Sequence, residues 1–198
     1  MSKLFFRYGA MNSGKSTAML QVAHNYEERD QRVVLVKSSV DTKGNDQIVS
    51  RLGVTRTADI LLSSGQDLRA ALHERATESS QDIACMLIDE AQFLTPEQVD
   101  QALAVAVLDG IPVVAFGIRT DFRTRAFPGS QRLMEVAHSL QEMKTICRCG
   151  SKAIFNARLG EQGIIRQGDQ VMIDGEQARY EALCARCYLE AEPRSALS

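Results

Sequence analysis

Three features are missing from this 198-residue sequence, and each absence argues against a class of protein. There is no long hydrophobic run, because Asp109, Gly110 and Pro112 interrupt the most apolar stretch, residues 102–118, whereas a membrane-spanning helix needs about 20 apolar residues. There is no excess of basic charge, since 23 Lys and Arg stand against 25 Asp and Glu. There is also no internal repeat or low-complexity tract. We therefore expect neither a membrane protein nor a protein that binds nucleic acid through an overall basic field.

The N-terminal residues lack the pattern of a secretory signal. Only three apolar residues, Leu4 to Phe6, stand together before Arg7, which is far shorter than the core of a signal peptide. We therefore expect a cytoplasmic protein in a reducing environment. Its five cysteines are then expected to be metal ligands or buried thiols rather than disulfides.

The composition is that of a soluble globular protein with one ordinary domain and a small appendage. Short apolar runs predict buried strands at residues 4–8, 33–36, 83–88 and 112–116. Helical patterns occupy residues 16–29, 68–77, 96–108 and 133–140, while residues 38–58 are polar and are predicted to be mostly loop. Continuous apolar strands that alternate with helices predict an α/β fold with a parallel central sheet.

A phosphate-binding loop is predicted directly after the first strand. The string GAMNSGKS fits the pattern G-x-x-x-x-G-K-[ST] at Gly9, Ala10, Met11, Asn12, Ser13, Gly14, Lys15 and Ser16. Main-chain N–H groups of such a loop surround the phosphates, and the following helix directs its N-terminus at them. Lys15 would reach the β- and γ-phosphates, and the Ser16 hydroxyl would ligate Mg²⁺. The loop therefore predicts binding of ATP with Mg²⁺.

Two consecutive carboxylates, Asp89 and Glu90, end the third predicted strand. Ligands of open parallel sheets lie beyond the carboxyl ends of the strands. There, Asp89 suits the Mg²⁺ site and Glu90 suits a general base for a hydroxyl nucleophile. Taken alone, the pair is equally consistent with a polar strand end. The string DEAQ also resembles a helicase motif, so a helicase or translocase ATPase stays an alternative, which the short chain and the absence of net basic charge disfavour.

Four of the five cysteines form two close pairs in a region of different texture. Beyond about residue 143 the chain becomes polar and rich in glycine, and it carries Cys147 and Cys149, then Cys184 and Cys187. Two such turns can complete a closed tetrahedral zinc site, which would be structural. Cys85 lies in an apolar strand and is expected in the core. A non-enzymatic zinc-ribbon module is a second alternative, but it leaves the phosphate loop and the paired carboxylates unexplained.

Taken in order, these motifs resemble those of the zinc-containing thymidine kinases of bacteria and the vertebrate cytosol. The matching strings are GAMNSGKS at 9–16, DEAQF at 89–93, GIRTDF at 117–122 and RLG at 158–160, followed by Tyr180 and the cysteine pairs. The resemblance covers residues 2 to about 190. It implies a RecA-like nucleotide-binding domain at 1–143 and a zinc-binding domain at 144–190. In the second domain a lasso-like lid loop, residues 159–182, closes over the nucleoside. A polar tail, 191–198, is expected to be flexible.

The resemblance also implies roles for individual residues. Glu90 resembles the acceptor of the 5′-hydroxyl proton, Asp89 the acid beside the Mg²⁺ shell, and Gln92 a neighbour of the phosphates. The residues that resemble the nucleoside pocket are Met11, Phe93, Phe122, Phe127, Asn156 and Tyr180. For Phe122 and Phe127 ordinary core packing is an equally good interpretation, and Tyr180 could simply pack in a hairpin.

The activity that the resemblance implies is ATP-dependent phosphorylation of thymidine to dTMP in nucleotide salvage, with 2′-deoxyuridine tolerated. It further implies a homotetramer, feedback inhibition by dTTP and no nucleic-acid partner. Lys43 and Arg51 are basic candidates near the phosphates, although both could equally be solvated loop charges. Lys43 stands where relatives often carry arginine, and the two side chains are not equivalent as phosphate ligands.

Overall fold

The computed structural model describes residues 1–40, 46–50, 53–161, 163–170 and 179–191. Lys43, Arg51, part of the predicted lasso loop (162 and 171–178) and all but the first residue of the predicted tail therefore lie outside the described residues. Within the described part, no helix is long and apolar enough to cross a membrane.

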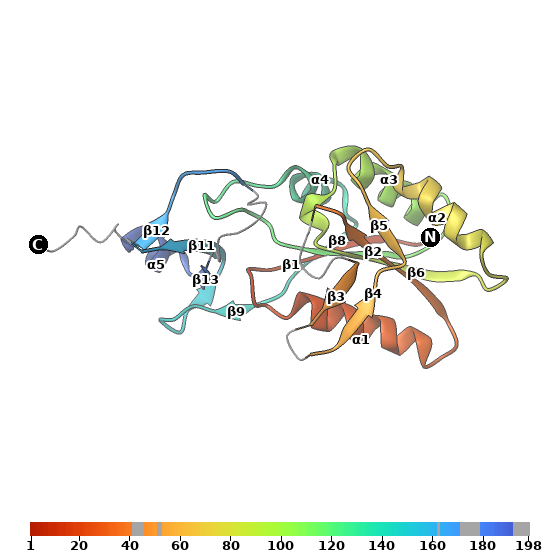
Figure 1. The fold of residues 1–198 in the computed structure, drawn as a ribbon, viewed down its shortest axis with the longest axis horizontal. Coiled ribbons are helices and arrows are strands. Elements are labelled where there is room, and N and C mark those ends of the chain that lie inside the picture. Colours follow the sequence, from red (N-terminus) through yellow and green to blue (C-terminus); the bar gives the residue numbers. More distant parts are fainter. Residues whose placement is uncertain (41–45, 51–52, 162, 171–178, 192–198) are drawn as a thin grey trace, which may run out of the picture.

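A six-stranded parallel sheet forms the centre of the larger unit (Figure 1). Its strands are β1 (Leu4–Tyr8), β2 (Arg32–Ser38), β5 (Ile60–Leu62), β6 (Ile83–Asp89), β7 (Val113–Gly117) and β8 (Ser139–Glu142). They are arranged in the order β5-β2-β6-β7-β1-β8, and every neighbouring pair is parallel. The predicted α/β class with a parallel sheet is thus confirmed.

Helices cover both faces of the sheet, which explains why its strands are continuously apolar. Helix α1 (Lys15–Glu27) lies on one face, and α2 (Leu68–Thr77), α3 (Pro96–Val107) and α4 (Pro128–Val136) lie on the other (Figure 1). Side chains of β6 alternate between two cores. Met86 and Ile88 pack on the α2–α4 side, while Cys85 and Leu87 pack on the α1 side.

Helix α3 begins at Pro96, where the helical pattern of residues 96–108 predicts its start. Thr95 Oγ1 accepts a hydrogen bond from the Gln98 main chain at 3.2 Å, and the Gln98 side chain accepts one from the Thr95 N–H at 3.1 Å. This capping box, followed by Pro96 in the first turn, satisfies main-chain donors that a helix start leaves unpaired.

One sequence prediction was wrong, and another missed a short hairpin. The helix predicted at 133–140 is instead α4, which begins at Pro128, followed by the edge strand β8, which pairs with β1. The region 38–58, predicted as loop, contains the hairpin of β3 (Gln47–Val49) and β4 (Thr55–Thr57). Each of these strands is short and at most one of its side chains is buried, so neither produces a clear apolar pattern.

A smaller unit with antiparallel strands follows β8 (Figure 1). It contains the pair β9 (Thr145–Ile146) and β10 (Lys152–Ala153), the sheet of β11 (Phe155–Gly160), β12 (Gly163–Ile165) and β13 (Arg179–Leu183), and helix α5 (Ala185–Glu190). Its core includes Ala157, Leu183 and Tyr188, and Ala10 of the phosphate loop belongs to the same cluster. The two units therefore share buried contacts.

Gly129 tests how closely α4 packs against the main chain of residues 91–94. A Cβ at this position in α4 would lie 2.5 Å from the Leu94 carbonyl oxygen and 2.9 Å from that of Ala91. We expect Gly129→Ala to lower the free energy of unfolding by about 1–3 kcal/mol, although alanine favours helices. The control Gly65→Ala, where a Cβ meets nothing within 4 Å, should leave thermal unfolding nearly unchanged. Equal melting temperatures for the two variants would contradict the close contact.

Candidate active site and metal centre

Three neighbouring strands end at one edge of the sheet, and each leads into a predicted site segment. β1 leads into the phosphate loop, β6 ends at Asp89, and β7 leads into residues 117–122. The Gly9 N–H donates a hydrogen bond to the Gly117 carbonyl oxygen at 3.2 Å. The parallel arrangement therefore gathers sequence motifs that are far apart along the chain.

The phosphate loop is compact and tightly enclosed. Gly9 has no room for a side chain, since a Cβ would lie 2.5 Å from the Met143 carbonyl oxygen, and Asn12 and Gly14 both have positive φ. The buried Ser13 hydroxyl has no hydrogen-bond partner among the described residues. The Lys15 ammonium lies across the loop, 3.1 Å from the Ala10 carbonyl oxygen. A buried unsatisfied hydroxyl and an ammonium group in one loop fit the binding of phosphate.

The carboxylate of Glu90 is held in a defined position. Glu90 has a left-handed backbone, with φ 47° and ψ 44°, which is uncommon for a residue other than glycine. The Gln92 amide donates to Glu90 Oε2 at 2.6 Å and accepts from the Ile118 N–H at 3.2 Å. Gln92 follows Glu90 in the 3₁₀ turn η1 (Ala91–Phe93) and is only 2% exposed. It therefore links Glu90 to the end of β7, while Asp89 is buried at the end of β6.

The six expected nucleoside-pocket residues form three groups of contacts. The rings of Phe93 and Phe127 meet edge to face, with centroids 5.7 Å apart. Asn156 accepts a hydrogen bond from the Met11 N–H at 2.6 Å. Phe122 and Tyr180 both contact Arg158, whose guanidinium lies 3.7 Å from the Phe122 ring centroid and donates to the Tyr180 hydroxyl at 3.0 Å.

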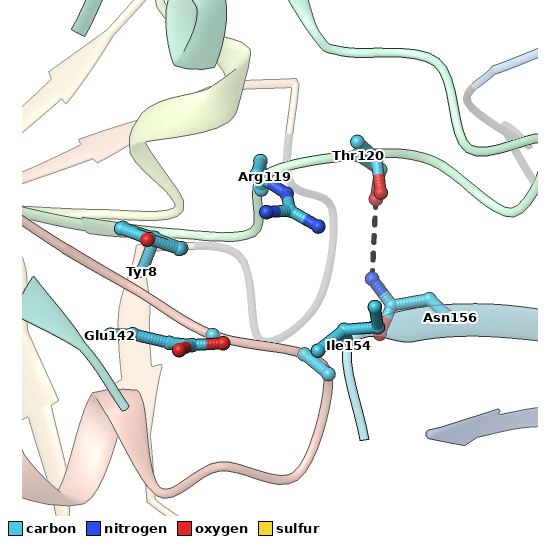
Figure 2. Close-up of a pocket in the computed structure, with 8 residues that line it drawn as sticks. Tyr8, Arg119, Thr120, Glu142, Ile154 and Asn156 are labelled. Carbon is cyan, nitrogen blue, oxygen red and sulfur yellow. Dashed lines mark hydrogen bonds between the residues drawn. The ribbon is translucent and has the colours of Figure 1, made fainter. Parts of the chain in front are cut away.

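Arg158 was not assigned a role from the sequence, where it stood out only within a matched string. It is 4% exposed, so its aromatic and hydroxyl contacts lie away from bulk water. Asn156 also makes a contact that the sequence did not predict. Its amide also donates to the Thr120 carbonyl oxygen at 3.2 Å, beside a small pocket (Figure 2). The lining residues of this pocket are Tyr8, Gly9, Ala10, Arg119, Thr120, Glu142, Ile154 and Asn156.

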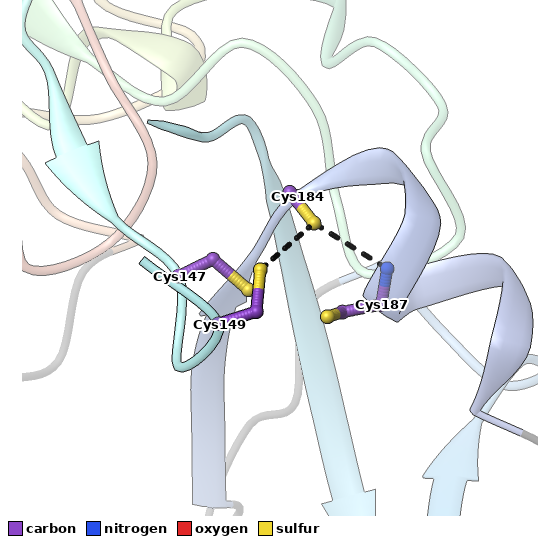
Figure 3. A group of neighbouring side chains, drawn as sticks. All are labelled: Cys147, Cys149, Cys184 and Cys187. Carbon is purple, nitrogen blue, oxygen red and sulfur yellow. Dashed lines mark hydrogen bonds between the residues drawn. The ribbon is translucent and has the colours of Figure 1, made fainter. Parts of the chain in front are cut away.

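The four paired cysteines meet at one place, as the sequence predicted (Figure 3). Their sulfur atoms all lie within 4.8 Å of one another, and Cys149 Sγ is 3.6 Å from Cys184 Sγ. Four thiolates around one zinc ion, each at about 2.3 Å, would lie about 3.8 Å apart. The cluster could therefore hold a metal ion such as zinc.

Local hydrogen bonds shift the thiol pKa values in this cluster. Hydrogen bonds from Ser151, and then from Cys187 and Cys184, lower the pKa of Cys149 to about 6. Hydrogen bonds with Cys149, Cys147 and Cys184 raise the pKa of Cys187 to about 12. Cys85 differs from all four because it is fully buried in the core, where burial raises its pKa to about 11. Its predicted core position is confirmed.

Comparison with known proteins agrees with the arrangement of these motifs. The thymidine kinase family model matches residues 2–188. Thymidine kinase from Idiomarina loihiensis is 50% identical over 96% of this chain and 98% of its own length. That from Chromobacterium violaceum is 47% identical over 95% and 98%, and that of enterobacteria phage T4 is 40% identical over 96% and 97%.

A solved structure described as the Pif1 helicase from Candida albicans covers 74% of this chain and 37% of its own, with a TM-score of 0.41 and 16% identity. A likeness at that level supports no conclusion about fold or function, so the helicase alternative gains nothing from it. The family match and the relatives extend over both the sheet and the cysteine-bearing unit. The chain thus belongs to the thymidine kinase family and phosphorylates thymidine.

Proposed function

We propose that Glu90 is the general base that accepts the 5′-hydroxyl proton of thymidine while the γ-phosphate of ATP is transferred to that oxygen. The observation that carries the proposal is the common sheet edge, where a hydrogen bond from Gly9 to Gly117 joins the phosphate loop to β7 and Gln92 joins β7 to Glu90. General bases act at hydrogen-bond distance from the proton they remove. The Glu90 carboxylate, which the Gln92 amide holds in place, is a group that can accept this proton.

The phosphoryl transfer is an in-line displacement. The 5′-oxygen forms a bond to the γ-phosphorus, the bond from the γ-phosphorus to the bridging oxygen breaks, and the products are dTMP and ADP. Main-chain N–H groups of residues 9–16 and the Lys15 ammonium stabilise the negative charge on the phosphates. Ser16 and Asp89 would hold Mg²⁺, which screens phosphate charge when bound, with Gln92 beside the phosphates. No step is assigned to Lys43 or Arg51.

The nucleoside pocket in this proposal is bounded by Met11, Phe93, Phe122, Phe127, Asn156 and Tyr180. Aromatic walls recognise the flat base by its faces, and one methyl group contributes only about 1–3 kcal/mol to discrimination. We therefore include 2′-deoxyuridine as a tolerated substrate. The Asn156 amide is hydrogen bonded to the main chain of Met11 and Thr120, so it joins β11 to the phosphate loop and to the residues that follow β7.

The cysteine cluster is proposed to hold one structural zinc ion. Its four ligands leave no open position for catalysis. We also propose a division into a nucleotide-binding domain at 1–143, a zinc-binding domain at 144–190 with its lasso loop, and a tail at 191–198. The first boundary falls between β8, which ends at Glu142, and β9, which begins at Thr145 in a different sheet.

Three further features rest on the family resemblance. We propose that the protein acts in the cytoplasm, assembles as a homotetramer and is inhibited by dTTP, which would occupy the nucleoside pocket. ATP and thymidine are its partners, and no nucleic acid is required. Strong stimulation of ATP hydrolysis by single-stranded DNA, without nucleoside, would instead favour the helicase alternative.

Glu90→Gln removes the proposed base while keeping the size of the side chain. We expect kcat to fall by about 10²-fold or more, with the KM for ATP little changed, in a coupled assay of ADP release with dTMP measured directly. Glu97→Gln is the matched control because Glu97 is exposed in the first turn of α3. A wild-type kcat for Glu90→Gln would refute the assignment.

Ser16→Ala removes a proposed Mg²⁺ ligand. We expect a higher Mg²⁺ concentration to be needed for half-maximal rate, because one oxygen ligand is lost. Ser16→Thr, which keeps a hydroxyl group, should behave nearly as the wild type. Titration of the rate with Mg²⁺ at fixed ATP measures the effect, and identical titration curves for all three proteins would remove Ser16 from the site.

Purified protein should contain about one zinc ion per chain, measured by elemental analysis without chelator present. Cys187→Ser should lower the zinc content and the melting temperature, since a closed four-thiolate site loses one ligand. Cys85→Ala is the control and should keep the full zinc content, because Cys85 lies in the core of the other unit. Zinc-free, fully stable wild-type protein would contradict a structural metal.

A further inference from the structure

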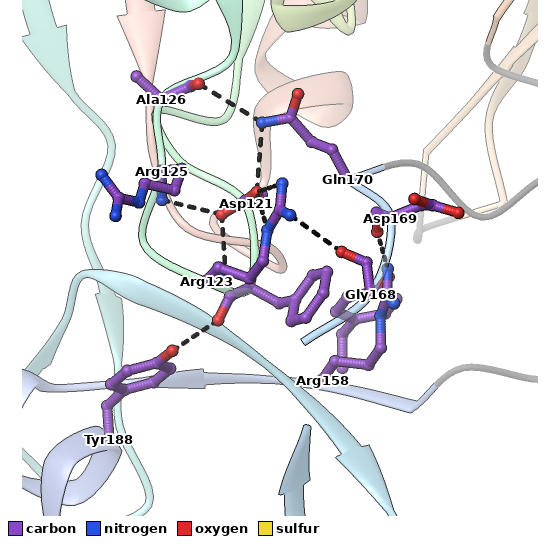
Figure 4. Close-up of polar contacts among 11 residues, drawn as sticks. Asp121, Arg123, Arg125, Ala126, Arg158, Gly168, Asp169, Gln170 and Tyr188 are labelled. Carbon is purple, nitrogen blue, oxygen red and sulfur yellow. Dashed lines mark hydrogen bonds and ion pairs between the residues drawn. The ribbon is translucent and has the colours of Figure 1, made fainter. Parts of the chain in front are cut away.

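Three consecutive residues between β12 and β13 are each bound by a different side chain (Figure 4). The Gly168 carbonyl oxygen accepts from Arg123 Nη1 at 3.0 Å, and the Asp169 carbonyl oxygen accepts from Arg158 Nη2 at 3.2 Å. The Gln170 side-chain amide donates to Asp121 Oδ2 at 3.2 Å and lies 3.4 Å from the Ala126 carbonyl oxygen. Residues 168–170 are thus hydrogen bonded to the loop that follows β7 and to Arg158 of β11.

The Asp121 carboxylate accepts hydrogen bonds from several groups besides Gln170. It is 2% exposed, and its Oδ1 accepts hydrogen bonds from the main-chain N–H groups of Arg123 at 2.9 Å and Arg125 at 2.8 Å. Its Oδ2 lies 2.9 Å from the Arg123 guanidinium. These donors hold the buried carboxylate in one orientation, and hydrogen bonds to a carboxylate are stronger than those between neutral groups. Gln170 therefore donates to a strong acceptor that other hydrogen bonds hold in place.

The ring of Phe122 connects this arrangement to the nucleoside pocket. Phe122 follows Asp121 in the chain, and its carbonyl oxygen accepts from the Tyr188 hydroxyl at 2.6 Å. Its ring lies under the Arg158 guanidinium. A Cβ on Gly168 would lie 3.9 Å from the ring and 3.6 Å from Arg158 Nη1. Residues 168–170 thus pack against the side chains that orient Phe122 and, through Arg158, Tyr180.

We propose that Gln170 is a positioning residue for nucleoside binding, and that it acts by anchoring residues 168–170 to the Asp121 carboxylate beside Phe122. This proposal rests on the placement of Phe122 and Tyr180 in the nucleoside pocket proposed above. Position 170 requires a hydrogen-bond donor, since a carboxylate there would face the carboxylate of Asp121. Gln170 touches neither the phosphate loop nor Glu90 in any of these bonds, so its effect belongs to nucleoside affinity rather than to phosphoryl transfer.

Replacement of Gln170 separates nucleoside affinity from catalysis. Gln170→Ala should raise the KM for thymidine by about 3–10-fold, the effect of one lost hydrogen bond. Gln170→Glu should raise it by more, because two carboxylates then face each other. The kcat and the KM for ATP should stay within about twofold, and equilibrium binding of thymidine without ATP should weaken in parallel with its KM. The control Gln167→Ala changes an exposed residue of the same segment and should match the wild type.

A double variant tests the contact itself. In Gln170→Glu with Asp121→Asn, the amide and the carboxylate exchange places, so the pair can again share a hydrogen bond. Asp121→Asn alone also weakens the pairing with Arg123, so it is measured as well. The rise in thymidine KM of the double variant should be smaller than the product of the rises in the two single variants, a coupling that independent effects would not produce. The melting temperatures of all variants identify any that fail to fold. A thymidine KM for Gln170→Ala and Gln170→Glu equal to that of Gln167→Ala would overturn the proposal.

Phe122→Leu separates failure of this proposal from failure of the proposed pocket. If folded Phe122→Leu raises the KM for thymidine while the Gln170 variants do not, only the role of Gln170 is refuted. If folded Phe122→Leu leaves that KM unchanged, Phe122 does not belong to the pocket, and both proposals are refuted.

Discussion

The rest of the structure depends on the parallel pairing of β1 with β7. The hydrogen bond from the Gly9 N–H to the Gly117 carbonyl oxygen continues this pairing into the phosphate loop. Parallel strands end at the same edge, so the phosphate loop after β1 and the acidic end of β6 lie at that edge. Gly117 is part of the same constraint, since a Cβ there would lie 2.9 Å from the Gln92 side-chain oxygen. A register shift between β1 and β7 would separate the phosphate loop from the amide that holds Glu90.

Several specific contacts join the two units of the chain in the part that the structure describes. Ala10 of the phosphate loop packs into the core of the cysteine-bearing unit. Asn156 of that unit binds the Met11 main chain, and Tyr188 binds the Phe122 main chain. The last two contacts each place a side chain of the smaller unit on the main chain of a site loop. The geometry of both site loops therefore depends on correct folding of the cysteine-bearing unit.

The features that could be predicted from the sequence are those whose physics is local. A phosphate loop, a capping box at Thr95 and two cysteine turns each require particular residues at fixed spacing, so their patterns are visible without a structure. The β3–β4 hairpin and the edge strand β8 bury few side chains, so no apolar period indicated them. The hydrogen bonds of Arg158 and Gln170 reach partners 11 to 49 residues away, and two of the acceptors are main-chain carbonyl oxygens. Main-chain acceptors leave no residue-type signature, and side-chain partners this far apart in the chain share no fixed spacing, so the sequence did not predict these contacts.

The left-handed backbone of Glu90 has a consequence for how this protein responds to selection. A side chain in that conformation costs about 1–2 kcal/mol that glycine would not. Relief of this strain favours Glu90→Gly, although the change also removes the acceptor of the buried Gln92 amide. Selection for growth on thymidine would reject Glu90→Gly if the carboxylate is the base. Thermostability and turnover would then pull this one position in opposite directions, and directed evolution for heat resistance would need an activity screen at every round.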